Sequence, residues 1–157
     1  MIKKLLLYID TSVLNYVFAD NVPGDREVTR ELFKEIKEER YGAFISDVVI
    51  AEVSRAPEQR IKEILGWIEQ YNLEVLEVDE EARSLAARYI EAGLIPPKYL
   101  DDALHIAIAT VNNLDVIVSW NFEHIVKLKT KLGVNGTNMM LGYRSIEIYS
   151  PREVIES

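Results

Sequence analysis

The stretch LLLYIDTS, residues 5–12, decides how the rest of the chain is interpreted. Its first five residues are apolar or aromatic, and a continuous run of this length is typical of a strand buried on both faces of a parallel sheet. Asp10 ends the run. Because ligands gather at the carboxyl ends of such strands, we expect Asp10 to lie at a functional edge. We expect Thr11 or Ser12 to cap the helix that follows.

Strand and helix patterns alternate along the rest of the chain. This alternation predicts an α/β fold whose mostly parallel sheet is covered by helices on both faces. The segment 73–78 alternates apolar and acidic residues, so we place it at an exposed edge of the sheet. Further strands are predicted over 5–9, 43–46, 115–119 and 146–149, helices over 11–19, 26–40, Ser46 or Asp47 to near Pro57, 58–71, 79 to Gly93, 99–112 and 121–132, a loop over 133–137, and a terminal helical turn from 150 to 153.

The composition limits the class of protein. With 157 residues, 48% of them apolar and 28% charged, the chain suits one globular domain, which we assign to 1–157. No apolar run approaches the roughly 20 residues of a membrane span. Cysteine is absent, which excludes disulfides and thiol chemistry and agrees with a cytoplasmic location. The net charge of −8 counts against broad electrostatic binding to nucleic acid, unless several acids cluster around a cation.

Three acids stand in segments that otherwise look fit for burial. Asp10 ends the first strand, Glu52 interrupts an apolar helix, and Asp102 opens a segment rich in alanine and isoleucine. Because buried carboxylates are rarely left unpaired, these acids together suggest a common site. Asn121, which follows the strand ending at Ser119, is a fourth polar candidate.

Each candidate also has an ordinary structural explanation. Asp102 and its neighbour Asp101 suit the first turn of a helix, where the helix dipole favours acids. Glu52 fits the solvated face of its helix, Asn121 fits a helix cap, and Asp10 fits a turn. Taken one at a time these explanations carry weight, but jointly they leave at least two acids within apolar runs unexplained.

Electrostatics supplies a reason for such acids to cluster. Two carboxylates about 4 Å apart repel by roughly 4 kcal/mol at an effective dielectric constant near 20. A divalent cation that prefers oxygen ligands removes this repulsion, and Mg²⁺ or Mn²⁺ suits carboxylates together with water. Such a cation can polarise a phosphoryl oxygen and activate water. The chemistry therefore predicts Asp10, Glu52 and Asp102 as ligands of Mg²⁺ or Mn²⁺.

The two histidines are weaker candidates for chemistry. His105 lies three residues after Asp102 and shares its helical face, but we expect it to be a hydrogen-bonded core residue. His124 follows Asn121 at the same spacing, and we expect a partly exposed helix residue. Zinc is disfavoured, because cysteine is absent and the histidines lack the spacing of paired ligands.

The chain resembles the PIN-domain family of metal-dependent ribonucleases, which includes the toxins of many prokaryotic toxin–antitoxin modules. The resemblance covers nearly the whole length and rests on the order and spacing of short motifs. These are YIDTSVL at 8–14, AEV at 51–53, DALHIA at 102–107 and VSWNF at 118–122. The resemblance implies a three-layer α/β/α sandwich with a central sheet of four or five mostly parallel strands.

The resemblance also implies roles for individual residues. By position, Asp10, Glu52 and Asp102 match three acids of the family's active site. The fourth acidic position falls at Asn121, which offers an oxygen ligand without a charge and could orient a water. Ser119 matches a hydroxyl position common beside that acid, and Thr11 is a second candidate for positioning substrate or water. Family members often self-associate as homodimers, and toxin members bind a small antitoxin protein.

The leading hypothesis is a metal-dependent endoribonuclease acting on RNA, the toxin of a toxin–antitoxin module, with Asp10, Glu52, Asp102 and Asn121 as catalytic residues. The alternative is a non-catalytic PIN-like module that binds RNA or a protein, which the neutral Asn121 and the acidic surface favour. A phosphatase of the haloacid dehalogenase type also carries an aspartate after its first strand. That class needs a second aspartate two residues later, where this chain has Ser12.

Overall fold

The computed structural model describes residues 3–155; residues 1–2 and 156–157, the ends of the predicted domain, lie outside the described part of the chain. Five parallel strands form one sheet in the order β3-β2-β1-β4-β5. The parallel sheet predicted from the sequence is confirmed, with β3 at an edge. The strands are β1 (Leu5–Ile9), β2 (Tyr41–Ser46), β3 (Glu74–Leu76), β4 (Val116–Val118) and β5 (Glu147–Tyr149).

Strand β1 is the centre of the sheet. Its Leu7 pairs with Ala43 of β2 on one side and with Val116 of β4 on the other. Tyr8 and Ile9 are fully buried, which explains why this strand carries an unbroken apolar run instead of an alternating one. The chain leaves β1 first towards β2 and β3, and it returns later to add β4 and β5 on the other side. Open parallel sheets bind ligands at such a reversal, here between β1 and β4.

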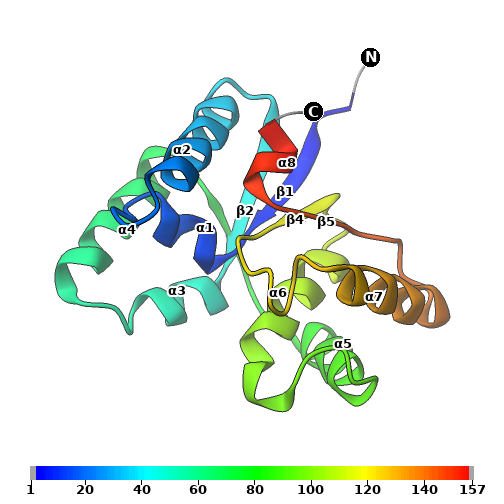
Figure 1. Cartoon of the computed structure of the whole chain (residues 1–157). Helices are drawn as coiled ribbons and strands as arrows, with labels where there is room; N and C mark the ends of the chain where they lie inside the picture. Colours follow the sequence, from blue (N-terminus) through cyan, green and yellow to red (C-terminus); the bar gives the residue numbers. More distant parts are fainter. Residues whose placement is uncertain (1–2, 156–157) are drawn as a thin grey trace.

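Helices cover both faces of the sheet, which gives the three layers that the resemblance implied (Figure 1). On one face α2 packs against α1 and α8, and on the other α5 packs against α6 and α7. None of the helices within residues 3–155 is long and apolar enough to cross a membrane. The helices are α1 (Thr11–Tyr16), α2 (Pro23–Lys37), α3 (Asp47–Val53), α4 (Glu58–Gln70), α5 (Glu80–Glu91), the 3₁₀ turn η1 (Pro97–Tyr99), α6 (Leu100–Val111), α7 (Leu128–Leu141) and α8 (Pro151–Ile155).

Several predicted boundaries shift for local reasons. The helix predicted over 26–40 begins at Pro23, because proline suits the first turn of a helix. The cap expected at Thr11 or Ser12 is Asp10 instead, whose carboxylate accepts a hydrogen bond from the N–H of Val13. The first helix therefore starts immediately after the strand, and the acid belongs to both elements.

The segment 121–137 is where the sequence prediction was wrong. Residues 121–127 form turns instead of a helix, and the predicted loop 133–137 lies inside α7. Asn121 acts as a cap, but of a turn: its Oδ1 accepts hydrogen bonds from the N–H groups of Glu123 and His124. A strong capping residue therefore did not mark the start of a helix here.

The residues that suggested a loop have tertiary roles in α7. A Cβ atom on Gly133 would lie 2.1 Å from Cδ2 of Leu94, so the glycine allows α7 to approach that segment closely. The Asn135 side chain bonds the backbone of Ile146, accepting from its N–H at 2.7 Å and donating to its carbonyl at 3.0 Å. Both residues are poor helix formers whose contacts offset their low helix propensity.

Three helices are followed by residues other than glycine in the left-handed backbone region. Glu39, Asn72 and Asn113 have φ values of 64°, 51° and 56° and follow α2, α4 and α6. This conformation strains side chains other than glycine by about 1 kcal/mol or more, and asparagine tolerates it better than glutamate does. Glu39 is therefore the least suited of the three.

Replacing Glu39 by glycine should raise the free energy of unfolding by about 1 kcal/mol, because glycine adopts positive φ without strain. Glu38→Gly is the matched control: Glu38 has a φ of −76°, so glycine there should lower the free energy of unfolding. Urea unfolding followed by tryptophan fluorescence measures both. Shifts of the same sign in the two variants would show that the strain does not lie at Glu39.

Candidate functional site

Asp10 lies at the carboxyl end of the central strand with 3% of its surface exposed. Its Oδ1 accepts hydrogen bonds from Ser12 Oγ at 2.6 Å and from the N–H of Val13 at 3.2 Å. Its Oδ2 accepts from Ser119 Oγ at 2.5 Å. Burial raises the pKa of Asp10 above its ordinary value, and the charge of His105 and these three donors lower it only in part. Within residues 3–155, no lysine or arginine pairs with this carboxylate.

Glu52 and His105 form a close pair between α3 and α6. Oε1 of Glu52 lies 2.6 Å from Nε2 of His105 and also accepts a hydrogen bond from Thr11 Oγ1 at 2.8 Å. Burial alone would raise the pKa of Glu52, but the hydrogen bond and charge of His105, with help from Thr11 and Arg55, hold it below its ordinary value. Burial alone would lower the pKa of His105, but Glu52, Asp10 and Asp102 hold it above its ordinary value.

Asp102 lies in the first turn of α6, where it meets Asn121. Nδ2 of Asn121 donates a hydrogen bond to Oδ2 of Asp102 at 3.2 Å. Burial raises the pKa of Asp102, and the charges of Asp10 and Glu52 raise it further, while the two histidines oppose the shift. The three predicted acids therefore lie close enough to influence one another's charge, although no hydrogen bond joins them.

The hydroxyl residues hold the two neighbouring strand ends together. Ser119, directly after β4, donates to Asp10 and accepts from the N–H of Asn121 at 2.9 Å. Ser12 also donates to Asp10 and accepts from the N–H of Trp120 at 2.9 Å. Asp10 thus organises the reversal between β1 and β4. Thr11, predicted to position substrate or water, contacts Glu52 in this structure.

Sequence reasoning missed three residues of this network. Ser12 was considered only as a helix cap, Tyr8 only as part of its strand, and Ser46 as the end of a strand and a candidate cap of the next helix, a cap that the structure confirms. Tyr8 is fully buried, and its hydroxyl lies 2.6 Å from Nδ1 of His105 and 2.7 Å from Oγ of Ser46. One signal was present in the sequence, since a tyrosine inside a buried strand needs a partner for its hydroxyl. His105 is a buried, hydrogen-bonded core residue, as predicted.

The carboxylate oxygens of the three acids suit a hard divalent cation, but they do not form a complete set of ligands around one point. Within residues 3–155, no three carboxylate, imidazole or thiol side chains converge as a ready-made ligand set. The buried carboxylate of Asp10 has only neutral hydrogen-bond donors, and Asp102 has one amide donor. Mg²⁺ commonly keeps several waters beside one or two carboxylates, so an open arrangement of acids is compatible with it.

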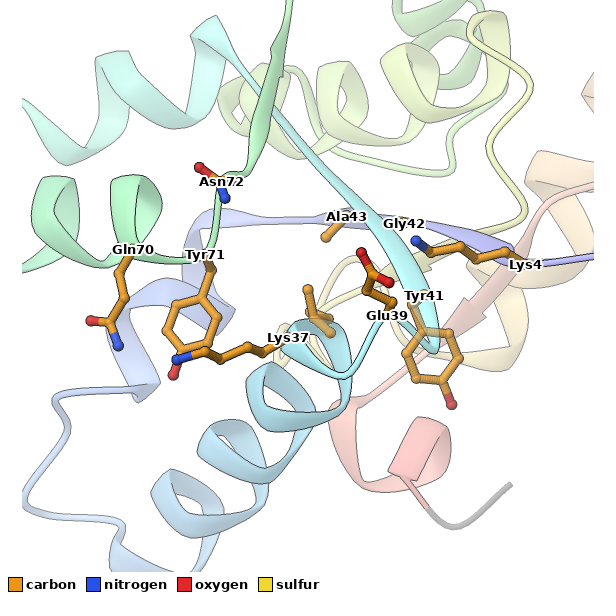
Figure 2. Close-up of a pocket in the computed structure, with 10 residues that line it drawn as sticks. Lys4, Lys37, Glu39, Tyr41, Gly42, Ala43, Gln70, Tyr71 and Asn72 are labelled. Atoms are coloured by element: carbon orange, nitrogen blue, oxygen red, sulfur yellow. The ribbon is translucent and has the colours of Figure 1, made fainter.

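A prominent pocket lies elsewhere on the molecule. It encloses about 320 Å³ and is lined by residues at the amino ends of the strands and the carboxyl ends of α2 and α4, among them Lys4, Lys37, Tyr41 and Asn72 (Figure 2). None of the predicted site residues lines it. The acids and this pocket therefore occupy opposite ends of the sheet, and only the acid end carries the predicted chemistry.

A comparison with protein-family models finds a match to the PIN domain over residues 7–125, a range that includes all four predicted catalytic positions. The chain belongs to the PIN-domain family. No curated protein sequence matches the chain significantly.

Solved structures of the same fold support this membership at the level of architecture. A VapBC2 structure from Rickettsia felis, bound to a promoter DNA fragment, has a TM-score of 0.58 at 16% identity and covers 93% of this chain and 98% of its own. DNA-bound VapBC from Salmonella typhimurium has a TM-score of 0.58 at 20% identity, with 94% and 98% covered. VapBC-5 from Mycobacterium tuberculosis, of the VapBC toxin–antitoxin systems, has a TM-score of 0.52 at 19% identity, with 92% and 98% covered.

Replacing Asp10 by asparagine should raise the free energy of unfolding of the metal-free PIN domain by about 1 kcal/mol, in the range of other substitutions that relieve functional strain. The change removes a buried charge, and the Ser119 hydroxyl can rotate to accept from the new amide. Asp115→Asn is the matched control, because Asp115 pairs with Arg144 at 3.1 Å and should lose stability. Chemical unfolding in the presence of a chelator measures both. A loss of stability in Asp10→Asn would contradict the inferred cost of its charge.

Proposed function

We propose that this PIN domain is a metal-dependent endoribonuclease that cleaves RNA phosphodiester bonds. The observation that carries the proposal is the buried carboxylate of Asp10, which pairs with no lysine or arginine within residues 3–155 and lies at the strand reversal beside Glu52 and Asp102. Buried anions without a cation are costly, so a site that keeps one is a candidate for metal binding.

In this proposal, Asp10, Glu52 and Asp102 hold Mg²⁺ or Mn²⁺, directly or through water. The bound cation would polarise a phosphoryl oxygen and activate water for attack on the phosphodiester. The protein's own contribution is orientation. The hydroxyls of Ser12 and Ser119 hold the carboxylate of Asp10 from both sides.

In this proposal, Asn121 stands at the fourth acidic position of the family and adds no charge. Its Nδ2 donates to Asp102 and its Oδ1 accepts two backbone N–H groups, so the side chain is held at both ends. We propose that Asn121 orients Asp102, together with a nearby water or the scissile phosphate. Ser119, which accepts from the N–H of Asn121, holds the start of this turn against Asp10.

We also propose that the protein is the toxin of a toxin–antitoxin module, with a small antitoxin as partner and a homodimer as its assembly. The support is the shared fold with three VapBC structures, one of them described as a member of a toxin–antitoxin family. A cytoplasmic location follows from this role, because an enzyme of this kind must reach its RNA.

The second candidate is a non-catalytic PIN-like module that binds RNA or a protein. Two observations favour it. Asn121 stands where the family has its fourth acid, and the described residues form no ready-made set of three metal ligands. The two candidates differ in a measurable way, since only the nuclease requires the acids to bind a divalent cation.

Purified wild-type protein should cleave single-stranded and structured RNA in the presence of Mn²⁺, and Asp10→Asn or Asp102→Asn should lower the rate by at least about 100-fold. Asp101→Asn is the matched control, because this neighbouring aspartate pairs with Arg55 at 3.4 Å and should leave cleavage nearly unchanged. Gel-based cleavage assays with all four proteins measure the rates. Equal cleavage by wild type and Asp10→Asn would point to a contaminating nuclease and end the assignment.

The affinity for Mn²⁺ should rise with pH. Burial raises the pKa values of Asp10 and Asp102, so protons compete with the cation at low pH, and binding releases them as the pH rises towards neutrality. Calorimetric titration over about pH 5 to 8, in buffers of different ionisation enthalpy, measures affinity and proton release together. Binding without proton release would contradict this account, and no binding at millimolar Mn²⁺ would favour the binding module.

A further inference from the structure

A chain of hydrogen bonds runs beneath the acids through four elements of the fold. Ser46 ends β2, Tyr8 lies in β1, His105 in α6 and Glu52 in α3. The successive distances are 2.7 Å from Ser46 Oγ to Tyr8 OH, 2.6 Å from Tyr8 OH to His105 Nδ1, and 2.6 Å from His105 Nε2 to Glu52 Oε1. Tyr8, Ser46 and His105 are all buried, with 0%, 0% and 1% of their surfaces exposed.

Counting hydrogens gives this chain a direction. Ser46 Oγ accepts from the N–H of Val48 at 3.2 Å, and within residues 3–155 the Tyr8 oxygen is the one acceptor in reach of its own hydrogen, which therefore points there. The Tyr8 hydrogen then goes to Nδ1 of His105, which accepts it. The ring proton of the neutral imidazole is therefore on Nε2 and is donated to Glu52.

The reverse direction leaves a buried group unsatisfied. If Nδ1 of His105 donated to Tyr8 and Tyr8 donated to Ser46, the Ser46 hydroxyl hydrogen would have no acceptor within residues 3–155. Buried donors without partners are rare and cost free energy. The direction from Ser46 through Tyr8 and His105 to Glu52 gives every hydrogen in this series of bonds an acceptor.

At the end of this chain, the two oxygens of Glu52 are unequal. Oε1 receives both His105 Nε2 and Thr11 Oγ1, at 2.6 and 2.8 Å. No donor in the described part of the chain reaches Oε2. One oxygen is thus engaged by the protein, and the other is left for a ligand.

We propose that Tyr8 and Ser46 are positioning residues: they orient His105 as the Nε2–H tautomer and through it hold Oε1 of Glu52, which leaves Oε2 for the cation. The part of this inference that concerns Oε2 rests on the proposed nuclease function. The part that concerns the proton on His105 does not. His105 lies one step behind Glu52, where the removal of a partner commonly changes metal affinity by about 10- to 100-fold, and Tyr8 acts through His105 from one step further away.

The test uses Tyr8→Phe with Tyr89→Phe as its matched control. Both tyrosines are fully buried and lose one hydroxyl, but Tyr89 bonds Asn138 at 2.6 Å and does not touch the network. The chain has two histidines, so the ¹⁵N spectrum of the imidazole nitrogens in metal-free protein is simple, and His124→Gln assigns it. The spectrum is recorded along a pH series that extends well above about pH 8, because, against the effect of burial, the neighbouring acids raise the pKa of His105 and the tautomer is read from its neutral form.

In wild type we expect the His105 proton on Nε2 and an Nδ1 resonance shifted by an accepted hydrogen bond. In Tyr8→Phe the Nδ1 resonance should move to the position of a free acceptor nitrogen, and the Kd for Mn²⁺ should increase by up to about 10-fold, the lower end of the range for a direct partner of a metal ligand. Tyr89→Phe should change neither. A wild-type proton on Nδ1, or an unchanged Nδ1 resonance and Kd in Tyr8→Phe, would overturn the proposal.

The two levels of the proposal fail separately. If wild type binds no Mn²⁺, the nuclease proposal fails, but the wild-type spectrum still decides whether Tyr8 donates to His105. If wild type binds Mn²⁺ and its spectrum shows no donated hydrogen bond at Nδ1, the nuclease stands and the positioning role of Tyr8 falls. The wild-type spectrum also decides the question if Tyr8→Phe does not fold.

Discussion

The burial of one carboxylate at the end of the central strand shapes the edge of the sheet where β1 and β4 end. Asp10 is almost fully enclosed, and the donors that stabilise its charge are neutral: two serine hydroxyls and one backbone N–H. The same two serines accept from the N–H groups of Trp120 and Asn121. The serines that stabilise the buried charge of Asp10 therefore also fix the backbone after β4. The acid is therefore both a cap of α1 and the link across the strand reversal.

A second constraint joins the helices on either side of this point. The pair of Glu52 and His105 connects α3 with α6, and the Tyr8 hydroxyl connects it to the central strand. Asp10 and Asp102 pair with no lysine or arginine within residues 3–155, and the charge of Asp10 raises the pKa of Asp102 further. Buried acids without such partners mark this edge of the sheet as a candidate functional site.

Much of this architecture followed from patterns along the chain. The first strand was predicted with its observed bounds, because an unbroken apolar run of this length is typical of a strand buried on both faces. The prediction failed over 121–137. Gly133 and Asn135 were predicted in a loop, but they lie inside α7, where they allow a close approach to Leu94 and bond the backbone of Ile146. Local propensity cannot reveal such contacts, since their partners lie elsewhere in the fold.

By itself, the sequence determined the α/β class, the burial of the first strand on both faces, the acid at the end of that strand and the family suggested by motif order. Only the tertiary structure decided how those residues are connected. Ser119 reaches Asp10 across 109 positions, His105 reaches Tyr8 across 97, and Glu52 reaches His105 across 53. A pattern of residue types carries no distances over such separations. Hydrogen-bond partners depend on positions within a few tenths of an ångström, which only the packed strands and helices define.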